Sequence, residues 1–187
     1  MNSRAHDLIR EFALVGSNLD RANLRGKDLR GVNFSNSTFR GADLTGADLR
    51  GAVFLKSDFS RACLHLADCE GADFSGCDLS MAYCKAANFT NAKIRHATLR
   101  CSIGKNALFL NADMRGTDFV NAFLVGARLE GANLDGCRNM DRAIFRLWIN
   151  PAGGRPSYDP VEGWIEQTSS FLGGLSLQEN AGPGRRQ

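Results

Sequence analysis

Large hydrophobic residues recur at every fifth position from residue 14 to residue 134. Of these 25 positions, twelve hold Leu and eight hold Phe, and the others are Cys69, Cys84, Ile94, Met114 and Gly104. Neither the 3.6-residue period of an α-helix nor the two-residue period of a β-strand produces this spacing. A period of five held over about 120 residues predicts a repeat architecture in which one structural unit stacks on the next.

A second inward position lies two residues before each large one. Sixteen of the 24 positions from 17 to 132 hold Ala, and most of the others hold Ser, Thr, Cys or Val. A small residue lets the backbone approach the interior closely, while the large residue fills that interior. The chain is therefore predicted to bend once every five residues around a shared core.

The positions two residues after each large one are predicted to be corners. Twelve of these 25 positions hold Gly and five hold Asn, which suits the positive φ that a type II turn requires at its third residue. We expect another turn type at the eight corners that break this rule, which are Arg21, Lys56, Arg61, Leu66, Met81, Ala86, His96 and Cys101.

Segments such as residues 41–50, with the sequence Gly-Ala-Asp-Leu-Thr-Gly-Ala-Asp-Leu-Arg, resemble the pentapeptide-repeat family and its consensus Ala-Asp/Asn-Leu-x-x. The resemblance covers about two-thirds of the chain and implies an all-β solenoid, namely a right-handed quadrilateral parallel β-helix with about 20 residues per coil. The repeats then make about six coils, in a rod on the order of 30 Å long at about 4.8 Å between neighbouring chains.

A period of 20 sorts the large residues into four stacked files. The first file contains Leu14, Phe34, Phe54, Phe74, Ile94, Met114 and Leu134. In the third file Gly104 leaves one level without a large side chain. We expect either that Phe109 leans into this gap or that a small cavity or bulge is present there.

Helices are predicted at both ends of the repeats, because the open backbone edges of a solenoid need cover. We expect an N-terminal capping helix over residues 1–13, the solenoid over 14–138 and a C-terminal capping helix over 139–150. Residues 151–158 are predicted to form a linker, 159–174 an amphipathic helix and 175–187 a flexible tail. The helix over 159–174 begins with Asp159 as N-cap. Its apolar stripe consists of Val161, Trp164, Ile165, Thr168, Phe171 and Leu172. This helix either folds back on the last coil or mediates a homodimer or partner contact.

Composition and charge narrow the function classes. The net charge is +3, and residues 14–134 carry 15 bases and 12 acids. No apolar run approaches the roughly 20 residues of a membrane span, and the N-terminus does not resemble a signal peptide. The six cysteines include no CxxC pair and no His partner at metal-ligand spacing. We expect a cytoplasmic protein with no cofactor, no metal, no membrane contact and no direct nucleic-acid binding.

The outward positions contain one candidate contact surface. The file running through Asn23, Asp43, Cys63, Tyr83, Ile103 and Phe123 becomes apolar toward its C-terminal end. Stacked outward apolar residues indicate a surface that another group covers. The candidate partner contact consists of Leu66, Tyr83, Ile103, Phe123, Val125, Trp164 and Ile165. Burial of the file under the C-terminal helix is the alternative interpretation.

No catalytic set is evident, because the three histidines belong to unrelated places in the repeat. The favoured hypothesis is a non-enzymatic protein–protein interaction module or scaffold, built on a rigid repeat. The resemblance also implies an alternative, since some family members protect DNA gyrase or topoisomerase IV from toxins and quinolones by mimicking DNA. Such mimicry needs a strongly acidic rod, and this chain does not have one. An enzyme or a nucleic-acid binder would need a pocket or a basic stripe, and neither is evident.

Overall fold

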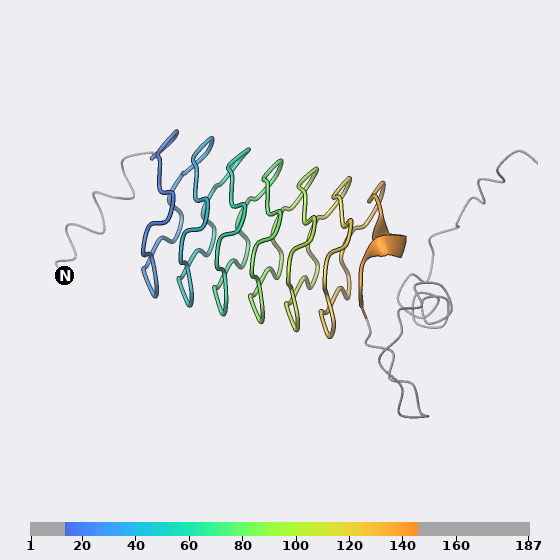
Figure 1. Ribbon diagram of the computed structural model, residues 1–187. Helices are drawn as coiled ribbons and strands as arrows, with labels where there is room; N and C mark the ends of the chain where they lie inside the picture. The colour runs from blue at the N-terminus through green and yellow to red at the C-terminus, as the bar shows by residue number, and fades with distance from the viewer. Residues whose placement is uncertain (1–13, 146–187) are drawn as a thin grey trace, which may run out of the picture.

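The computed structural model describes residues 14–145, which wind into a solenoid of stacked coils (Figure 1). The backbone pairs with itself in parallel at a separation of 20 residues, with bridges every five residues from Asn18↔Thr38 to Asp118↔Arg138. Two hydrogen bonds form each rung, as where Thr38 N donates to Ser17 O (2.9 Å) and Leu19 N donates to Thr38 O (2.7 Å). Each coil therefore has four faces, and each face is a single bridge rather than a longer strand. We number the faces by the file of large residues that each contains, starting from Leu14 (first), Leu19 (second), Leu24 (third) and Leu29 (fourth).

All 25 corner positions share one backbone conformation. From residue 16 to residue 136 their φ angles lie between 54° and 72°, whether the residue is Gly or not. The expectation of a different turn type at Arg21, Lys56, Arg61, Leu66, Met81, Ala86, His96 and Cys101 is therefore wrong. The reason is the ladder between coils, because Lys56 N donates to Ser75 O (3.0 Å) just as Gly76 N donates to Arg95 O (2.8 Å). The neighbouring coil fixes the corner, and a non-Gly residue there accepts strain of roughly 1–2 kcal/mol.

The large residues fill one continuous core in the predicted files. The rings of Phe34 and Phe54 stack with centroids 5.6 Å apart, and those of Phe54 and Phe74 stack at 4.9 Å. The neighbouring file meets this one edge-on, with the Phe59 ring 5.0 Å from that of Phe54 at an angle of 87°. Stacked and edge-to-face rings are the favoured aromatic geometries, so the files contact one another as well as themselves.

The gap expected at Gly104 is filled from the next coil. A Cβ atom on Gly104 would lie 2.7 Å from Leu124 Cδ2. Leu124 belongs to the same file and is fully buried. The side chain of Leu124 therefore fills this level, and the two expectations of a leaning Phe109 or a small cavity or bulge are wrong.

Polar residues replace Ala at the small inward position of one file, and each has a partner. Ser57 Oγ donates to Phe34 O (2.8 Å), Cys77 Sγ to Phe54 O (2.8 Å) and Thr117 Oγ1 to Ile94 O (2.6 Å). The acceptor always lies 23 residues earlier, on the adjacent coil. A buried hydroxyl is tolerated when it is hydrogen-bonded, so this ladder explains why the small position of this file admits Ser, Thr and Cys.

The C-terminal end of the solenoid contains one extra residue. The helix predicted over 139–150 is wrong over its described part, where a 3₁₀ helix, η1 (Met140–Arg142), is followed by extended residues. Ile144 then pairs with Phe123, at a separation of 21 instead of 20. Its amide donates to Ala122 O (2.8 Å) and its carbonyl accepts from Leu124 N (2.7 Å). Backbone hydrogen bonds with the last coil thus decide the conformation here against the local preference for a helix. The short 3₁₀ helix accommodates the added residue.

The other predicted end elements lie outside the described residues. These are the capping helix over 1–13, the linker over 151–158, the amphipathic helix over 159–174 and the tail over 175–187. Across residues 14–145, no helix has the length and apolar character needed to cross a membrane.

Candidate interaction surface

The residue at the middle of each face points outward and usually caps the following corner. Asp58 Oδ1 accepts the amide N–H of Ser60 (2.8 Å), and Asn88 Oδ1 accepts that of Thr90 (3.1 Å). These contacts are Asx turns, in which a short polar side chain bonds to the backbone two residues on. They give the Asp residues before the large positions a structural role.

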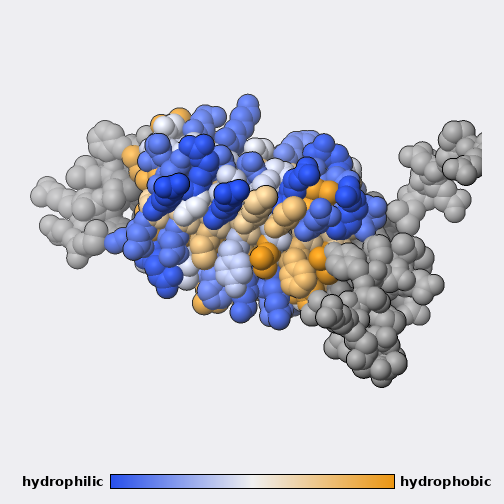
Figure 2. All heavy atoms as spheres, viewed as in Figure 1, coloured by the Kyte–Doolittle hydropathy of each residue, from blue (hydrophilic) through white to orange (hydrophobic). Residues whose placement is uncertain are grey.

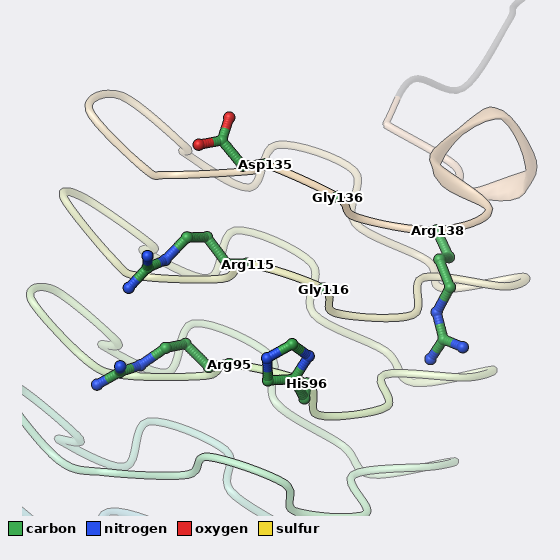
Figure 3. Close-up of a pocket in the computed structure, with 7 residues that line it drawn as sticks. All are labelled: Arg95, His96, Arg115, Gly116, Asp135, Gly136 and Arg138. Carbon is green, nitrogen blue, oxygen red and sulfur yellow. The ribbon is translucent and has the colours of Figure 1, made fainter.

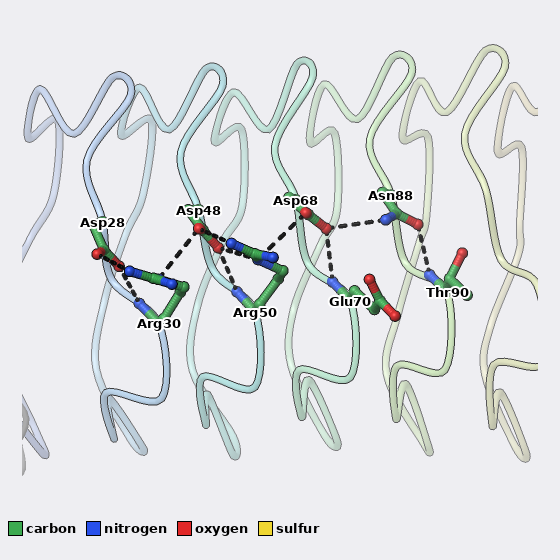
Figure 4. Close-up of polar contacts among 8 residues, drawn as sticks. All are labelled: Asp28, Arg30, Asp48, Arg50, Asp68, Glu70, Asn88 and Thr90. Atoms are coloured by element: carbon green, nitrogen blue, oxygen red, sulfur yellow. Dashed lines mark hydrogen bonds and ion pairs between the residues drawn. The ribbon is translucent and has the colours of Figure 1, made fainter.

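On the fourth face these caps are joined into a chain of ion pairs (Figure 4). Arg30 forms a bidentate pair with Asp28 and also lies 3.3 Å from Asp48 on the next coil. Arg50 repeats the arrangement with Asp48, and its hydrogen bonds lower the pKa of the Asp48 carboxyl. The carboxylates of Asp28, Asp48 and Asp68 are therefore neutralised locally instead of forming an open acidic strip.

The third face differs, because an apolar stripe runs along its middle. We define the apolar stripe as Cys63, Tyr83, Ile103, Phe123 and Ile144, which pair in succession through backbone bridges. Tyr83 is 37% exposed and Ile103 is 42% exposed, whereas Phe123 and Ile144 are half-buried. Figure 2 shows a row of apolar side chains of this kind crossing the coils, bordered by hydrophilic ones.

The fold gives no reason for apolar residues along this stripe. Cys63, Tyr83, Ile103 and Phe123 occupy positions where the other faces mostly carry Asp, Asn or Thr; the exceptions there are Val53, Lys93, Leu108, Arg128 and Arg138. Within residues 14–145 the amide N–H groups that they would cap, two residues further on, have no protein acceptor. Each missing Asx bond forgoes on the order of 0.5–1.5 kcal/mol. Because these apolar side chains replace four capping hydrogen bonds, they favour a binding role for the stripe over a structural one.

Basic groups border the apolar stripe on one side. Lys85 and Lys105 follow it at the edge of the face, and no ion pair involves either of them within the described part of the chain. His65 precedes them in the same file, where its ring packs 5.8 Å from that of Tyr83 and its Nδ1 lies 2.9 Å from Lys85 O. No Asp or Glu lies on this face from Cys63 to Ile144, so the surface is apolar with a basic edge.

The predicted contact residues fall on this surface in part. Tyr83, Ile103 and Phe123 are brought into one file, and Val125 lies beside Phe123 in the file of the two lysines. Leu66 is 58% exposed at the corner beyond Cys63, outside the stripe itself. The other two predicted residues, Trp164 and Ile165, lie outside the described residues.

Ile144 is the stripe residue that the sequence analysis missed. The extra residue before it moved it out of the five-residue register. The signal that could have found it is the triplet at residues 143–145, in which a small residue and a large one again flank an outward one. Ala143 is indeed buried, at 7% exposure.

An open hollow lies elsewhere, at the corners between the first and second faces (Figure 3). Its lining consists of Arg95, His96, Arg115, Gly116, Asp135, Gly136 and Arg138. Arg95 and Arg115 both pair with Asp113, at 3.3 and 2.8 Å, and they point away from Arg138 (Figure 3). Because the cations do not converge on one point and two of them already share the Asp113 carboxylate, the hollow does not form a designed anion site.

The buried thiols show no activation. All six cysteines are free, and burial raises the pKa of Cys77 and Cys84 to about 12 and that of Cys69 well above its usual value. A thiol needs a lowered pKa and access to solvent to act as a nucleophile. Across residues 14–145, no three His, Cys, Asp or Glu side chains are placed to share a metal ion.

Comparisons with known proteins agree with this architecture. The sequence profile of Pentapeptide repeats matches in eight copies, over residues 14–51, 33–68, 67–100 and 105–146. Among solved structures, HetL, a pentapeptide repeat protein involved in heterocyst differentiation regulation from the cyanobacterium Nostoc sp. strain PCC 7120, is 28% identical. That match covers 73% of this chain and 67% of HetL, with a TM-score of 0.46.

Two further structures are similar at comparable levels. A pentapeptide repeat protein from the Arabidopsis thaliana thylakoid lumen is 27% identical over 57% of this chain and 71% of its own, with a TM-score of 0.49. QnrB1, a plasmid-mediated fluoroquinolone resistance protein, is 20% identical in its trypsin-treated form, over 89% of this chain and 98% of its own, with a TM-score of 0.44. No curated protein matches the chain.

Proposed function

Since this chain belongs to the pentapeptide repeat family, we propose that it is a non-catalytic scaffold for protein–protein interaction and that the apolar stripe is its binding face. The stripe carries the proposal, because Tyr83 and Ile103 are exposed, and the other stripe residues half-buried, along a file where the fold itself favours polar caps. The solenoid supports this role, since a stack of hydrogen-bonded coils presents its faces as rigid surfaces. We further propose that the coils wind right-handed, about six in number, and that the protein acts in the cytoplasm.

A partner on this face would gain most from the centre of the stripe. Contact residues that dominate binding are large, lie at the centre of an interface and become fully desolvated. Tyr83, Ile103 and Phe123 meet these conditions once covered, and Leu66 and Val125 would lie at the rim. Lys85 and Lys105 would favour a partner whose facing edge is acidic.

Site-specific photo-crosslinking in the native cells tests this proposal. A photoreactive residue at position 103 is expected to capture a protein partner, and Tyr83→Asp is expected to abolish the capture. Leu55 is the matched control, because it is 39% exposed on another face. Equal capture from positions 55 and 103, or capture that survives Tyr83→Asp, would remove the stripe as the binding face.

Gyrase or topoisomerase protection by DNA mimicry is not favoured by any specific feature of this chain. A DNA mimic presents unpaired negative charge, whereas Asp28 and Asp48 on the fourth face are paired with arginines. A supercoiling assay with gyrase and a quinolone distinguishes the two functions. The scaffold proposal expects no relief of inhibition by the added protein.

A further inference from the structure

We propose that residues 159–172 of this same chain form a helix that lies along the apolar stripe, as an internal cover that a partner must displace. The regulatory meaning of this contact rests on the proposed function. The contact itself rests on the length of the helix, the reach of residues 146–158 and the charges of the two surfaces. The sequence predicts an amphipathic helix here, with Val161, Trp164, Ile165 and Leu172 on one side. Such a helix needs an apolar surface, and the stripe is a surface that needs cover.

The two surfaces match in length. Four coil-to-coil steps separate Cys63 from Ile144, and at about 4.8 Å per step the stripe is roughly 19 Å long. A helix over residues 159–172 would be about 21 Å long at 1.5 Å per residue. One helix can therefore cover the whole stripe without extending far beyond it.

The connection between them is long enough and begins at the right place. The described chain ends at Phe145, next to Ile144, which is itself the last residue of the stripe. Residues 146–158 separate this point from the helix, and an extended chain spans about 3.3–3.6 Å per residue. That reach, on the order of 45 Å, is more than twice the length of the stripe. The helix can thus be placed on the stripe within one molecule, and a second copy is not required.

The charges are also complementary. Residues 159–174 contain Asp159, Glu162 and Glu166 and no base. At 100° per residue, Glu162 lies about 60° beyond Ile165 at the edge of the helix's apolar side, whereas Glu166 and Asp159 lie on the side opposite to it. The apolar stripe has its basic edge, Lys85 and Lys105, on one flank as well.

Hydrogen exchange on the full-length protein tests the contact. An isolated helix shorter than about 12–15 residues is marginal in water, so protection of residues 159–172 requires docking. We expect these amides to exchange at least tenfold more slowly than those of residues 175–187. Ile103→Asp combined with Phe123→Asp should abolish this difference, whereas Leu55→Asp on the first face should leave it unchanged. Protection of residues 14–138 reports in the same experiment whether each variant is folded.

A charge swap supplies a second test. Glu162→Lys should accelerate exchange of the helix severalfold at low salt, and adding Lys85→Glu with Lys105→Glu should restore the protection. Failure of the two lysine replacements to restore the protection would remove the predicted contact between Glu162 and the basic edge. Equal exchange of 159–172 and 175–187 in the unaltered protein would overturn the inference. Protection that disappears on dilution, together with a change from dimer to monomer in sedimentation, would overturn it in favour of a second copy.

These measurements use no partner, so they separate the two proposals. Protection of 159–172 without any partner captured from position 103 would contradict the proposed function alone. Partner capture with an unprotected helix would contradict the internal cover alone. If both proposals hold, Trp164→Ala should increase partner capture from position 103 severalfold, because the competing segment is weakened.

Discussion

Replacement of Ile103 by Asn tests whether the apolar stripe is needed for folding. An Asn at this position can accept the unpaired amide N–H of Lys105, as Asn88 does for Thr90 at 3.1 Å, and such a bond contributes about 0.5–1.5 kcal/mol. Ile103 is 42% exposed, so the substitution also forfeits somewhat more than half of the roughly 1.5–3 kcal/mol of a fully buried aliphatic side chain. The two effects nearly cancel, and we expect a change within about 1 kcal/mol in the free energy of unfolding.

The same substitution at Ile94 is the matched control. Ile94 is fully buried in the first file, so Ile94→Asn creates a cavity worth about 2–5 kcal/mol and also buries an amide without a designed partner. Urea unfolding of the full-length protein, followed by circular dichroism, gives both free energies. The reasoning is refuted if Ile103→Asn destabilises the protein by more than about 2 kcal/mol, because the stripe would then be part of the structural core.

Three further outcomes follow from other features. The Arg40 side chain donates two hydrogen bonds to Asp20 and lowers the pKa of that carboxyl to about 2. This stabilisation is complete above the unfolded pKa near 4 and is lost as the pH falls toward 2. Asp20→Asn should therefore make the urea midpoint depend less on pH between about 4 and 2. Leu66 has a φ of 56° and a largely exposed side chain, so Leu66→Gly should stabilise the protein by about 0.5–1 kcal/mol, and a loss of stability in thermal unfolding would contradict the strain argument. Gly104→Ala should destabilise by about 1–3 kcal/mol through contact with Leu124; in a background of Leu124→Ala the same change should be close to neutral, and strict additivity in the double-mutant cycle would refute the contact.

The sequence by itself determined the repeat, the inward files and the pairing of coils. Large residues at one position in five and small ones at another leave a chain few ways to bury both, and this is why the phenylalanine files could be written down in advance. The chemistry of the surface was also partly visible. Tyr83, Ile103 and Phe123 differ from the Asp and Asn of equivalent positions, and this contrast needs only the register to be noticed.

Only the tertiary structure decided the corners, the filled level at Gly104 and the end of the solenoid. Local preference favours another turn at Met81, yet the hydrogen bond from its amide to Arg100 O, at 2.8 Å, imposes a positive φ. Helix propensity after residue 139 likewise gives way to the pairing of Ile144 with Phe123. In each case the deciding partner lies about 20 residues away on the next coil. Local sequence preferences are weak, whereas a ladder of hydrogen bonds repeated along every face is cooperative.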